Sequence, residues 1–377
     1  MNFNCTEQQT MLRTMARDFL IKECPKSRTR ELERDQKGYS PDTWNHMAAL
    51  GWMGLVLPEQ YGGSNADFMD LVVLMEEIGR NILPGPFFPT VALAAFPIME
   101  YGSEEQKSRY LPPIARGEKI WTLALNETSA DCNCKGIKTA AKLENGEYIL
   151  NGEKLFVPYA AIADYMLVVA RIKKDRVLDK GFTLFIVDRN KSGIDVETIP
   201  TITGEMQCRV RLKGVKLSES DVLGMAGNAG NALGRILDKA SLLKCAEVSG
   251  ACQSVLDMTN TYARERLQFG KPIGSFQVIQ HRLVDMLIDV EGLQYLVSQA
   301  AWLMSIGADC GEQLAMAKAK ANEVYQRVAL SGVKIHGAIG FSMDHDIGLY
   351  YRRVIASKFF PRDTDYYLEK VARGIGL

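Results

Sequence analysis

A turn is predicted within Tyr262-Ala263-Arg264-Glu265-Arg266-Leu267-Gln268-Phe269-Gly270-Lys271-Pro272-Ile273. Gly270 and Pro272 carry this prediction, because glycine and proline interrupt regular structure. Apolar residues recur at helical spacing on both sides of the turn, in four stripes over about residues 232–263, 275–306, 312–335 and 345–358. Three long helices and a short one, joined by brief connections, predict an antiparallel four-helix bundle over residues 226–377.

A β pattern precedes this bundle, over residues 121–225. Asn145-Gly146 and Asn151-Gly152 each predict a β-hairpin turn. Short apolar runs predict further strands at Trp121–Leu125, Met166–Ala170, Phe182–Val187 and Cys208–Leu212. Tight turns at this density indicate an antiparallel, barrel-like β-domain.

The first 120 residues are predicted to be helical. Capping residues indicate three helix starts there, at Thr6 with Gln9, at Ser40-Pro41 and at Ser103 with Gln106. The chain is therefore predicted to be mostly α, with an N-terminal helical domain (1–120), a middle β-domain (121–225) and a C-terminal bundle (226–377).

Composition excludes several classes of function. The 377 residues contain 45 basic and 45 acidic side chains, so no net charge attracts nucleic acid or an anionic membrane. The first residues predict no signal peptide, and no apolar run is long enough for a membrane span. Cys132 and Cys134 lie close together without a second pair to complete a zinc site, which favours reduced thiols in a cytoplasmic protein.

Common catalytic motifs are not matched. Gly224, Gly227, Gly230 and Gly234 do not have the spacing of a dinucleotide fingerprint. The four histidines have no metal-ligand spacing, and no serine lies in a nucleophile elbow. We therefore expect no metal and a bound organic cofactor.

Four segments carry a resemblance to a known family. They are Tyr101–Lys107 with Leu111-Pro112, Tyr148–Val157 with Ile162–Asp164, Tyr262–Ile273 continuing to Met286, and Ile335–Phe341. In this order they resemble the acyl-CoA dehydrogenase family over essentially the whole chain. The resemblance implies that family's fold, FAD as cofactor, and oxidation of an acyl-CoA thioester to its α,β-unsaturated form, as in beta-oxidation.

The resemblance also implies a mechanism and partners. A carboxylate removes the α-proton while a β-hydride passes to the flavin. The weakly acidic α-C–H requires hydrogen bonds to the thioester oxygen, and the carboxylate must be close and shielded from water. The implied partners are the acyl-CoA substrate, an electron-transfer flavoprotein, and further subunits in a homo- or hetero-tetramer or a dimer of dimers.

Arg266 is implied to contact the pyrophosphate of FAD that is bound mainly by a neighbouring subunit. Its guanidinium offers two donors to phosphate oxygens; the alternative is a surface arginine in a helix-terminal turn. Phe269 and Gln277 lie beside it in the motif. The glycine-rich turn adds Gly337, Ala338 and Lys334, although the family usually has glycine at position 338 and glutamine at position 334.

The β-domain is implied to contribute Leu125, Asn126 and Phe156 to the cofactor site. It departs from the family pattern, with Asn126–Asp131 in place of a Thr-Glu-Pro segment, and Phe156 and Pro158 in place of tryptophan and threonine. Proline has no N–H to donate. Phe156 is interpreted either as a ring that packs on the flavin or as an ordinary core aromatic.

The predicted base is Glu247. It lies on the apolar stripe of its helix, four residues after Leu243 and four before Ala251. A carboxylate on an inward face is costly unless it has a function or a partner. The alternative is a structural pair with Lys244. The family's commonest base, a glutamate after the short helix, is absent from Phe359–Thr364. Asp363 is the second candidate there, and its alternative role is to cap the final helix.

Four functions remain in competition. The first is an active flavin dehydrogenase with Glu247 as base. The second is a subunit of a hetero-oligomer that completes half of a flavin site without its own chemistry. A third is a scaffold that only binds protein, which the Arg266–Gly270 run disfavours. The fourth is a related flavin enzyme that reduces enoyl thioesters or adds oxygen.

Overall fold

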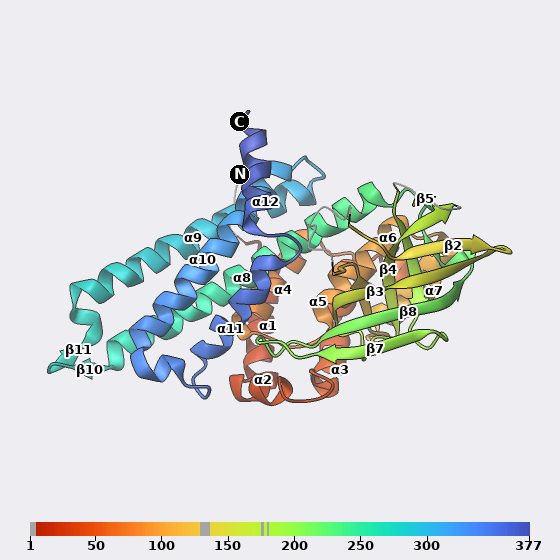
Figure 1. Cartoon of the computed structure of the whole chain (residues 1–377). Helices are drawn as coiled ribbons and strands as arrows, with labels where there is room; N and C mark the ends of the chain where they lie inside the picture. Colours follow the sequence, from red (N-terminus) through yellow and green to blue (C-terminus); the bar gives the residue numbers. More distant parts are fainter. Residues whose placement is uncertain (1–4, 129–135, 175–176, 179–180) are drawn as a thin grey trace. The chain divides into compact units, whose positions relative to one another are not determined.

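The computed structural model describes residues 5–128, 136–174, 177–178 and 181–377 (Figure 1). The chain divides into two compact units that we describe separately. The helical unit comprises Met1–Arg30, Asp67–Leu83 and Ser241–Leu377, and the sheet unit comprises Glu31–Ala66 and Pro84–Ala240. The three-domain division of the sequence remains a prediction. Cys132, Cys134 and residues 129–131 lie outside the described residues.

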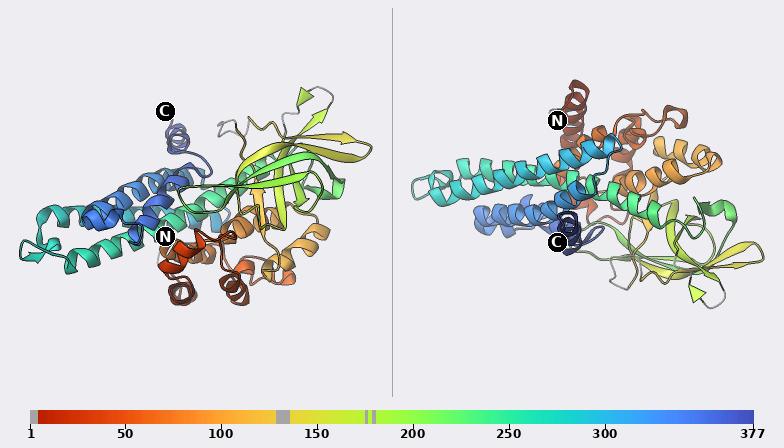
Figure 2. Two further views of the ribbon diagram at one scale, coloured as in Figure 1. Left: turned by 60° about the horizontal axis from the view of Figure 1, so that its bottom comes forward. Right: turned by 90° about the horizontal axis from the view of Figure 1, so that it is seen from above.

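The helical unit consists of helices, and four of them begin and end close to the four predicted stripes. They are α1 (Glu7–Glu23), α2 (Lys26–Leu32), α4 (Phe68–Asn81), α8 (Gly230–Glu265), α9 (Gln277–Ser305), α10 (Gly311–His336), α11 (Ile347–Phe359) and α12 (Thr364–Gly374). The last residues of α2 and the start of α8 belong to the sheet unit. The Thr6–Gln9 capping box that opens α1 is confirmed. Figure 2 shows α9 and α10 side by side, and α10 also packs against α11 and α12.

Helices α4 and α8 pack backbone to backbone. A Cβ atom at Gly79 of α4 would lie 1.8 Å from the carbonyl oxygen of Glu247 on α8. A Cβ atom at Gly250 of α8 would likewise lie 1.8 Å from the carbonyl oxygen of Glu76. Real Cβ contacts are never this short, so both positions need glycine. The backbone of α8 around Glu247 is therefore fixed against α4.

We expect Gly79→Ala to lower the free energy of unfolding by about 1–3 kcal/mol, because the added methyl group overpacks this contact. Urea unfolding of the variant would measure the loss. The control is Gly234→Ala on α8, where a Cβ would meet no atom within 4 Å. That change should stabilise slightly, since alanine favours a helix over glycine by about 0.5–1 kcal/mol. An unchanged midpoint for Gly79→Ala would contradict the close contact.

The sheet unit combines short helices with a β-sheet in which β4 joins two sets of paired strands. Its helices are α3 (Pro41–Ala49), α5 (Phe87–Thr90), α6 (Phe96–Tyr101) and α7 (Glu104–Ala115). Its strands are β1 (Trp121–Ala124), β2 (Ala140–Glu144), β3 (Glu147–Pro158), β4 (Tyr165–Lys174), β5 (Val177–Leu178), β6 (Thr183–Asp188), β7 (Ile194–Ile199), β8 (Gln207–Leu217) and β9 (Val222–Leu223). The strand order is β7-β8-β3-β2-β4-β6-β9, and β1 and β5 also pair with β4. Buried apolar side chains from β1 to β4, β6, β8 and β9 form its core.

Two predictions for this unit need correction. The hairpin at Asn145-Gly146 is confirmed, but the one at Asn151-Gly152 is wrong, because β3 runs through both residues. Asn151 instead accepts a hydrogen bond from the Gly214 N–H (2.8 Å), and Gly152 allows close contact with Thr139. The sheet is mixed, not wholly antiparallel, since β1 and β2 both pair with β4 in parallel.

Within the described residues, no helix is long and apolar enough to cross a membrane. No group of three or more metal-binding side chains converges in that part of the chain either.

Candidate functional site

Glu247 lies on α8 among buried residues. Cys245, Ala246 and Val248 are buried on either side of it, while its own side chain is 21% exposed. One carboxylate oxygen, Oε2, lies 2.6 Å from Nζ of Lys244. The structural pair with Lys244, which the sequence offered as the alternative to a catalytic base, is therefore present. A paired carboxylate can still act as a base if substrate displaces the ammonium, so the role of Glu247 stays a prediction.

Asp363 has a structural position. Its side chain accepts a hydrogen bond from the Tyr366 N–H (3.0 Å) as the N-cap of α12. An aspartate suits this position because its oxygen satisfies a backbone donor that the helix leaves unpaired. A carboxylate occupied in this way is a weaker candidate for proton abstraction than Glu247.

A buried lysine, which the sequence reading missed, anchors the connection between α11 and α12. Lys318 of α10 donates to the Ser357 carbonyl oxygen (2.9 Å) and to Oδ1 of Asn322 (2.6 Å). Asn322 in turn contacts Lys358 and Thr364. Burial lowers the pKa of Lys318 to about 8, and the negative charge of Glu247 acts in the opposite direction. The sequence signal that could have revealed Lys318 is a lysine on the apolar face of a helix.

The turn after α8 displays its side chains outward. Arg266 is exposed, and strands β10 (Leu267–Gln268) and β11 (Lys271–Pro272) form a small hairpin behind it. Phe269 is 90% exposed at a positive φ of 54°. Gln277, the first residue of α9, is also exposed. An exposed guanidinium beside an exposed aromatic ring suits a ligand with a phosphate and a flat ring system.

An aromatic stack brings the glycine-rich turn to the end of α8. The Tyr262 ring stacks on His336 at 4.4 Å between centroids, and its hydroxyl donates to the His336 carbonyl oxygen (3.3 Å). Burial lowers the pKa of His336 and so favours the neutral ring. Gly337 follows at a φ of 66°, which favours glycine. Lys334 and Ala338 are exposed beside it.

The sheet unit displays Phe156 at an irregularity in β3. The register between β3 and β8 shifts between Lys154 and Val157, and Phe156 has a positive φ of 52°. Its ring is 54% exposed, so the reading of an ordinary core aromatic is wrong. The Leu155 N–H donates to the Asn126 carbonyl oxygen (2.9 Å), which places Leu125 and Asn126 beside this strand. A left-handed non-glycine residue that exposes an aromatic ring is typical of a ligand site.

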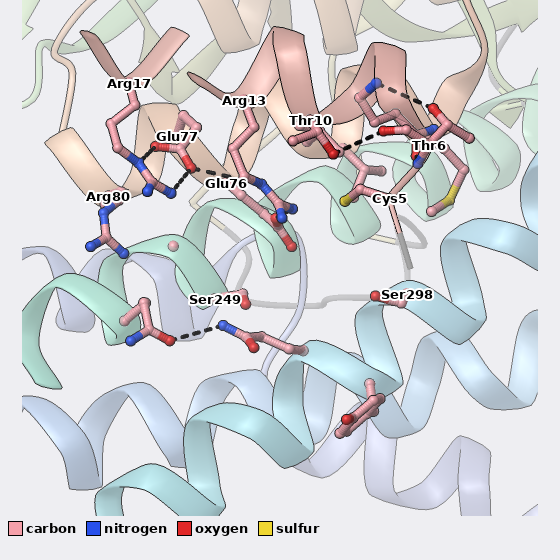
Figure 3. A pocket seen from close by; sticks show the side chains of 18 of the residues that line it. Cys5, Thr6, Thr10, Arg13, Arg17, Glu76, Glu77, Arg80, Ser249 and Ser298 are labelled. Atoms are coloured by element: carbon pink, nitrogen blue, oxygen red, sulfur yellow. Dashed lines mark hydrogen bonds and ion pairs between the residues drawn. The ribbon is translucent and has the colours of Figure 1, made fainter. Parts of the chain in front are cut away.

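A separate polar pocket of about 740 Å³ lies inside the helical unit, between α1, α4, α8 and α9 (Figure 3). Four of its charged side chains form ion pairs, with Arg13 2.7 Å from Glu76 and Arg17 2.6 Å from Glu77. The buried hydroxyl of Ser249 has no hydrogen-bond partner in the described residues. None of the site residues predicted from the sequence lines this pocket.

Comparison with known proteins gives consistent matches. Family models match the N-terminal domain of acyl-CoA dehydrogenase at residues 6–118, its middle domain at 122–215 and its C-terminal domain at 230–375. The chain is 31% identical to the probable acyl-CoA dehydrogenase YngJ of Bacillus subtilis (strain 168), over 92% of both chains. It is 31% identical to the caffeyl-CoA reductase-Etf complex subunit CarC of Acetobacterium woodii, over 92% of both. The butyryl-CoA dehydrogenase structure from Megasphaera elsdenii matches with a TM-score of 0.92 and 27% identity over 100% of both chains.

Proposed function

This chain belongs to the acyl-CoA dehydrogenase family, and we propose from that premise that it is an FAD-dependent enzyme acting on the α,β bond of an acyl-CoA thioester. The observation that carries the proposal is the match of all three family domains in order. The paired turns at Arg266 and Gly337 support it, because they present a cation and an open glycine at one place.

Two groups of residues fit FAD. We assign Arg266, Phe269, Gln277, Lys334, Gly337 and Ala338 to one group and Leu125, Asn126 and Phe156 to the other. Arg266 and Lys334 offer positive charge to the pyrophosphate, and the φ of Gly337 lets the backbone approach a ligand closely. Phe156 offers an exposed ring face to the flavin. FAD, when bound, supplies the hydride acceptor that no side chain can supply.

We propose Glu247 as the base that removes the α-proton. Its place on a helix held against α4 by Gly79 favours a fixed carboxylate, and fixed geometry contributes strongly to proton transfer. Lys244 must release Oε2 before that oxygen accepts a proton.

The names of the relatives bear on the direction of the reaction and on the electron partner. YngJ is named a dehydrogenase, whereas CarC is named a reductase subunit in a complex with Etf. We therefore propose an electron-transfer flavoprotein as partner of this chain. Oxidation of the acyl-CoA is the direction we favour, and the same site can run the reverse reaction.

The visible absorption spectrum and flavin content of the chain purified alone would test this proposal. We expect close to one oxidised FAD per chain, and bleaching on anaerobic addition of a suitable acyl-CoA from a panel. A chain that stays colourless and cannot be reloaded with FAD would contradict the proposal. It would favour the half-site subunit instead, a reading supported by the Lys244–Glu247 pair and by Pro158 in place of a flavin-bonding threonine.

A further inference from the structure

A buried charged pair lies in the sheet unit. Lys154 of β3 is fully buried, and its Nζ lies 2.7 Å from Oε1 of Glu127, whose side chain is 7% exposed. Burying two charges costs solvation energy, and apolar residues of similar volume often serve stability as well or better. Stability alone is therefore a poor reason for this pair to be here.

The pair joins three segments of the chain. Glu127 accepts hydrogen bonds from the Thr139 hydroxyl (2.6 Å), from the Thr139 N–H (3.0 Å) and from the Lys138 N–H (2.6 Å). Lys154 also donates to the Leu125 carbonyl oxygen (3.1 Å). The chain after β1, the start of β2 and the middle of β3 are thus held at one point.

The surroundings of Glu127 favour its charged form, and glycine makes room for its contact with Thr139. Burial by itself would raise the pKa of Glu127, but the charge of Lys154 and the hydrogen bonds outweigh it and hold the pKa below its ordinary value. A Cβ atom at Gly152 would lie 2.4 Å from Oγ1 of Thr139. Gly152 therefore lets Thr139 reach the carboxylate.

The Glu127–Lys154 pair lies next to the residues of the sheet unit that we assigned to the flavin. Leu125 and Asn126 directly precede Glu127, and Phe156 lies two residues after Lys154, where the register of β3 shifts. The hydrogen bond from the Leu155 N–H to Asn126 ties the two sides together. A left-handed residue such as Phe156 keeps its conformation only where its surroundings determine it.

We propose that Glu127 and Lys154 are positioning residues, which fix Leu125, Asn126 and Phe156 in the arrangement that receives the flavin. This inference rests on the proposed function. The pair acts through these three residues and contacts no reacting atom itself.

The test is the double variant Glu127→Gln/Lys154→Met, made in the full chain. It removes both charges and so leaves no unpaired buried charge, while glutamine keeps an acceptor for Thr139. We expect an unfolding midpoint near that of the wild type, faster hydrogen exchange at the Leu155 amide, and a dissociation constant for FAD raised at least about tenfold. The single variant Glu127→Gln, which removes the carboxylate opposite the buried Lys154 ammonium, should lose stability as well.

The control and the opposing outcomes separate this inference from the proposed function. Arg211→Gln, in an exposed ion-pair network of the same sheet with Glu153 and Asp195, should change neither Leu155 exchange nor FAD affinity. Unchanged Leu155 exchange in the double variant, or faster exchange with unchanged FAD affinity, would overturn the positioning role while wild-type FAD binding stands. A wild type that binds no FAD would overturn the proposed function, and this inference with it, before any variant is compared.

Discussion

Glu247→Gln is expected to reduce the rate of substrate-driven flavin bleaching by about 10²–10⁴-fold, the usual contribution of a positioned general base. The amide has nearly the same volume as the carboxylate but cannot accept the α-proton. FAD content should stay at the wild-type value, because Glu247 lies on α8 about 28 Å along the helix axis from Arg266, at 1.5 Å per residue. Anaerobic stopped-flow absorbance after mixing with acyl-CoA would measure the rate.

Two further variants make the result specific. Glu323→Gln removes a carboxylate that pairs with Arg327 on α10 and should leave bleaching unchanged. Asp363→Asn tests the other candidate cleanly, because asparagine caps a helix about as well as aspartate. Full activity of Glu247→Gln together with loss in Asp363→Asn would move the base to Asp363. Full activity in both variants would exclude both residues.

The helices could be predicted because each depends on its own sequence. The stripe over 275–306 corresponds to α9 (Gln277–Ser305), and the capping box of Ser103 and Gln106 opens α7. Apolar periodicity and capping are local properties, so nothing distant needs to be known. The antiparallel reading of the β-domain was less accurate. Whether β1 pairs with β4 in parallel depends on a residue distant in the sequence, and no local pattern encodes it.

Asn151-Gly152 shows why a strong local signal can fail. The pair favours a tight turn, but in β3 its two residues serve contacts with Gly214 of β8 and with Thr139, which directly precedes β2. Only the tertiary structure reveals those contacts. The burial of Lys154 was missed for the same reason, because a turn predicted at Asn151-Gly152 would interrupt the face of β3 that buries Tyr148, Leu150 and Lys154.

The site residues also divide into those with a local sequence signal and those whose contacts only the tertiary structure reveals. The exposure of Arg266 and Phe269 agrees with a role toward a ligand, and the motif around them was local. The contact of Tyr262 with His336 joins two motifs that the sequence could only place in order. The pair of Glu247 and Lys244 could be proposed from spacing, but its formation depends on the rotamers that packing selects.

Arg266→Ala is expected to weaken FAD binding by roughly 10–100-fold. Hydrogen bonds to charged groups are worth about 1.5–3 kcal/mol, and each 1.4 kcal/mol changes the dissociation constant tenfold. Stability should change little, because the Arg266 side chain is exposed. Fluorescence titration of the flavin-free protein with FAD would give the dissociation constant.

Arg266→Lys separates charge from geometry at the same position. Lysine keeps the positive charge but has no planar fork, so it should recover only part of the affinity. Arg264→Ala, another exposed arginine two residues earlier, should bind FAD like the wild type. Equal retention of FAD by Arg266→Ala and the wild type would remove Arg266 from the site. Equal losses in both alanine variants would mean that the net charge of the turn, and not the Arg266 fork, attracts the pyrophosphate.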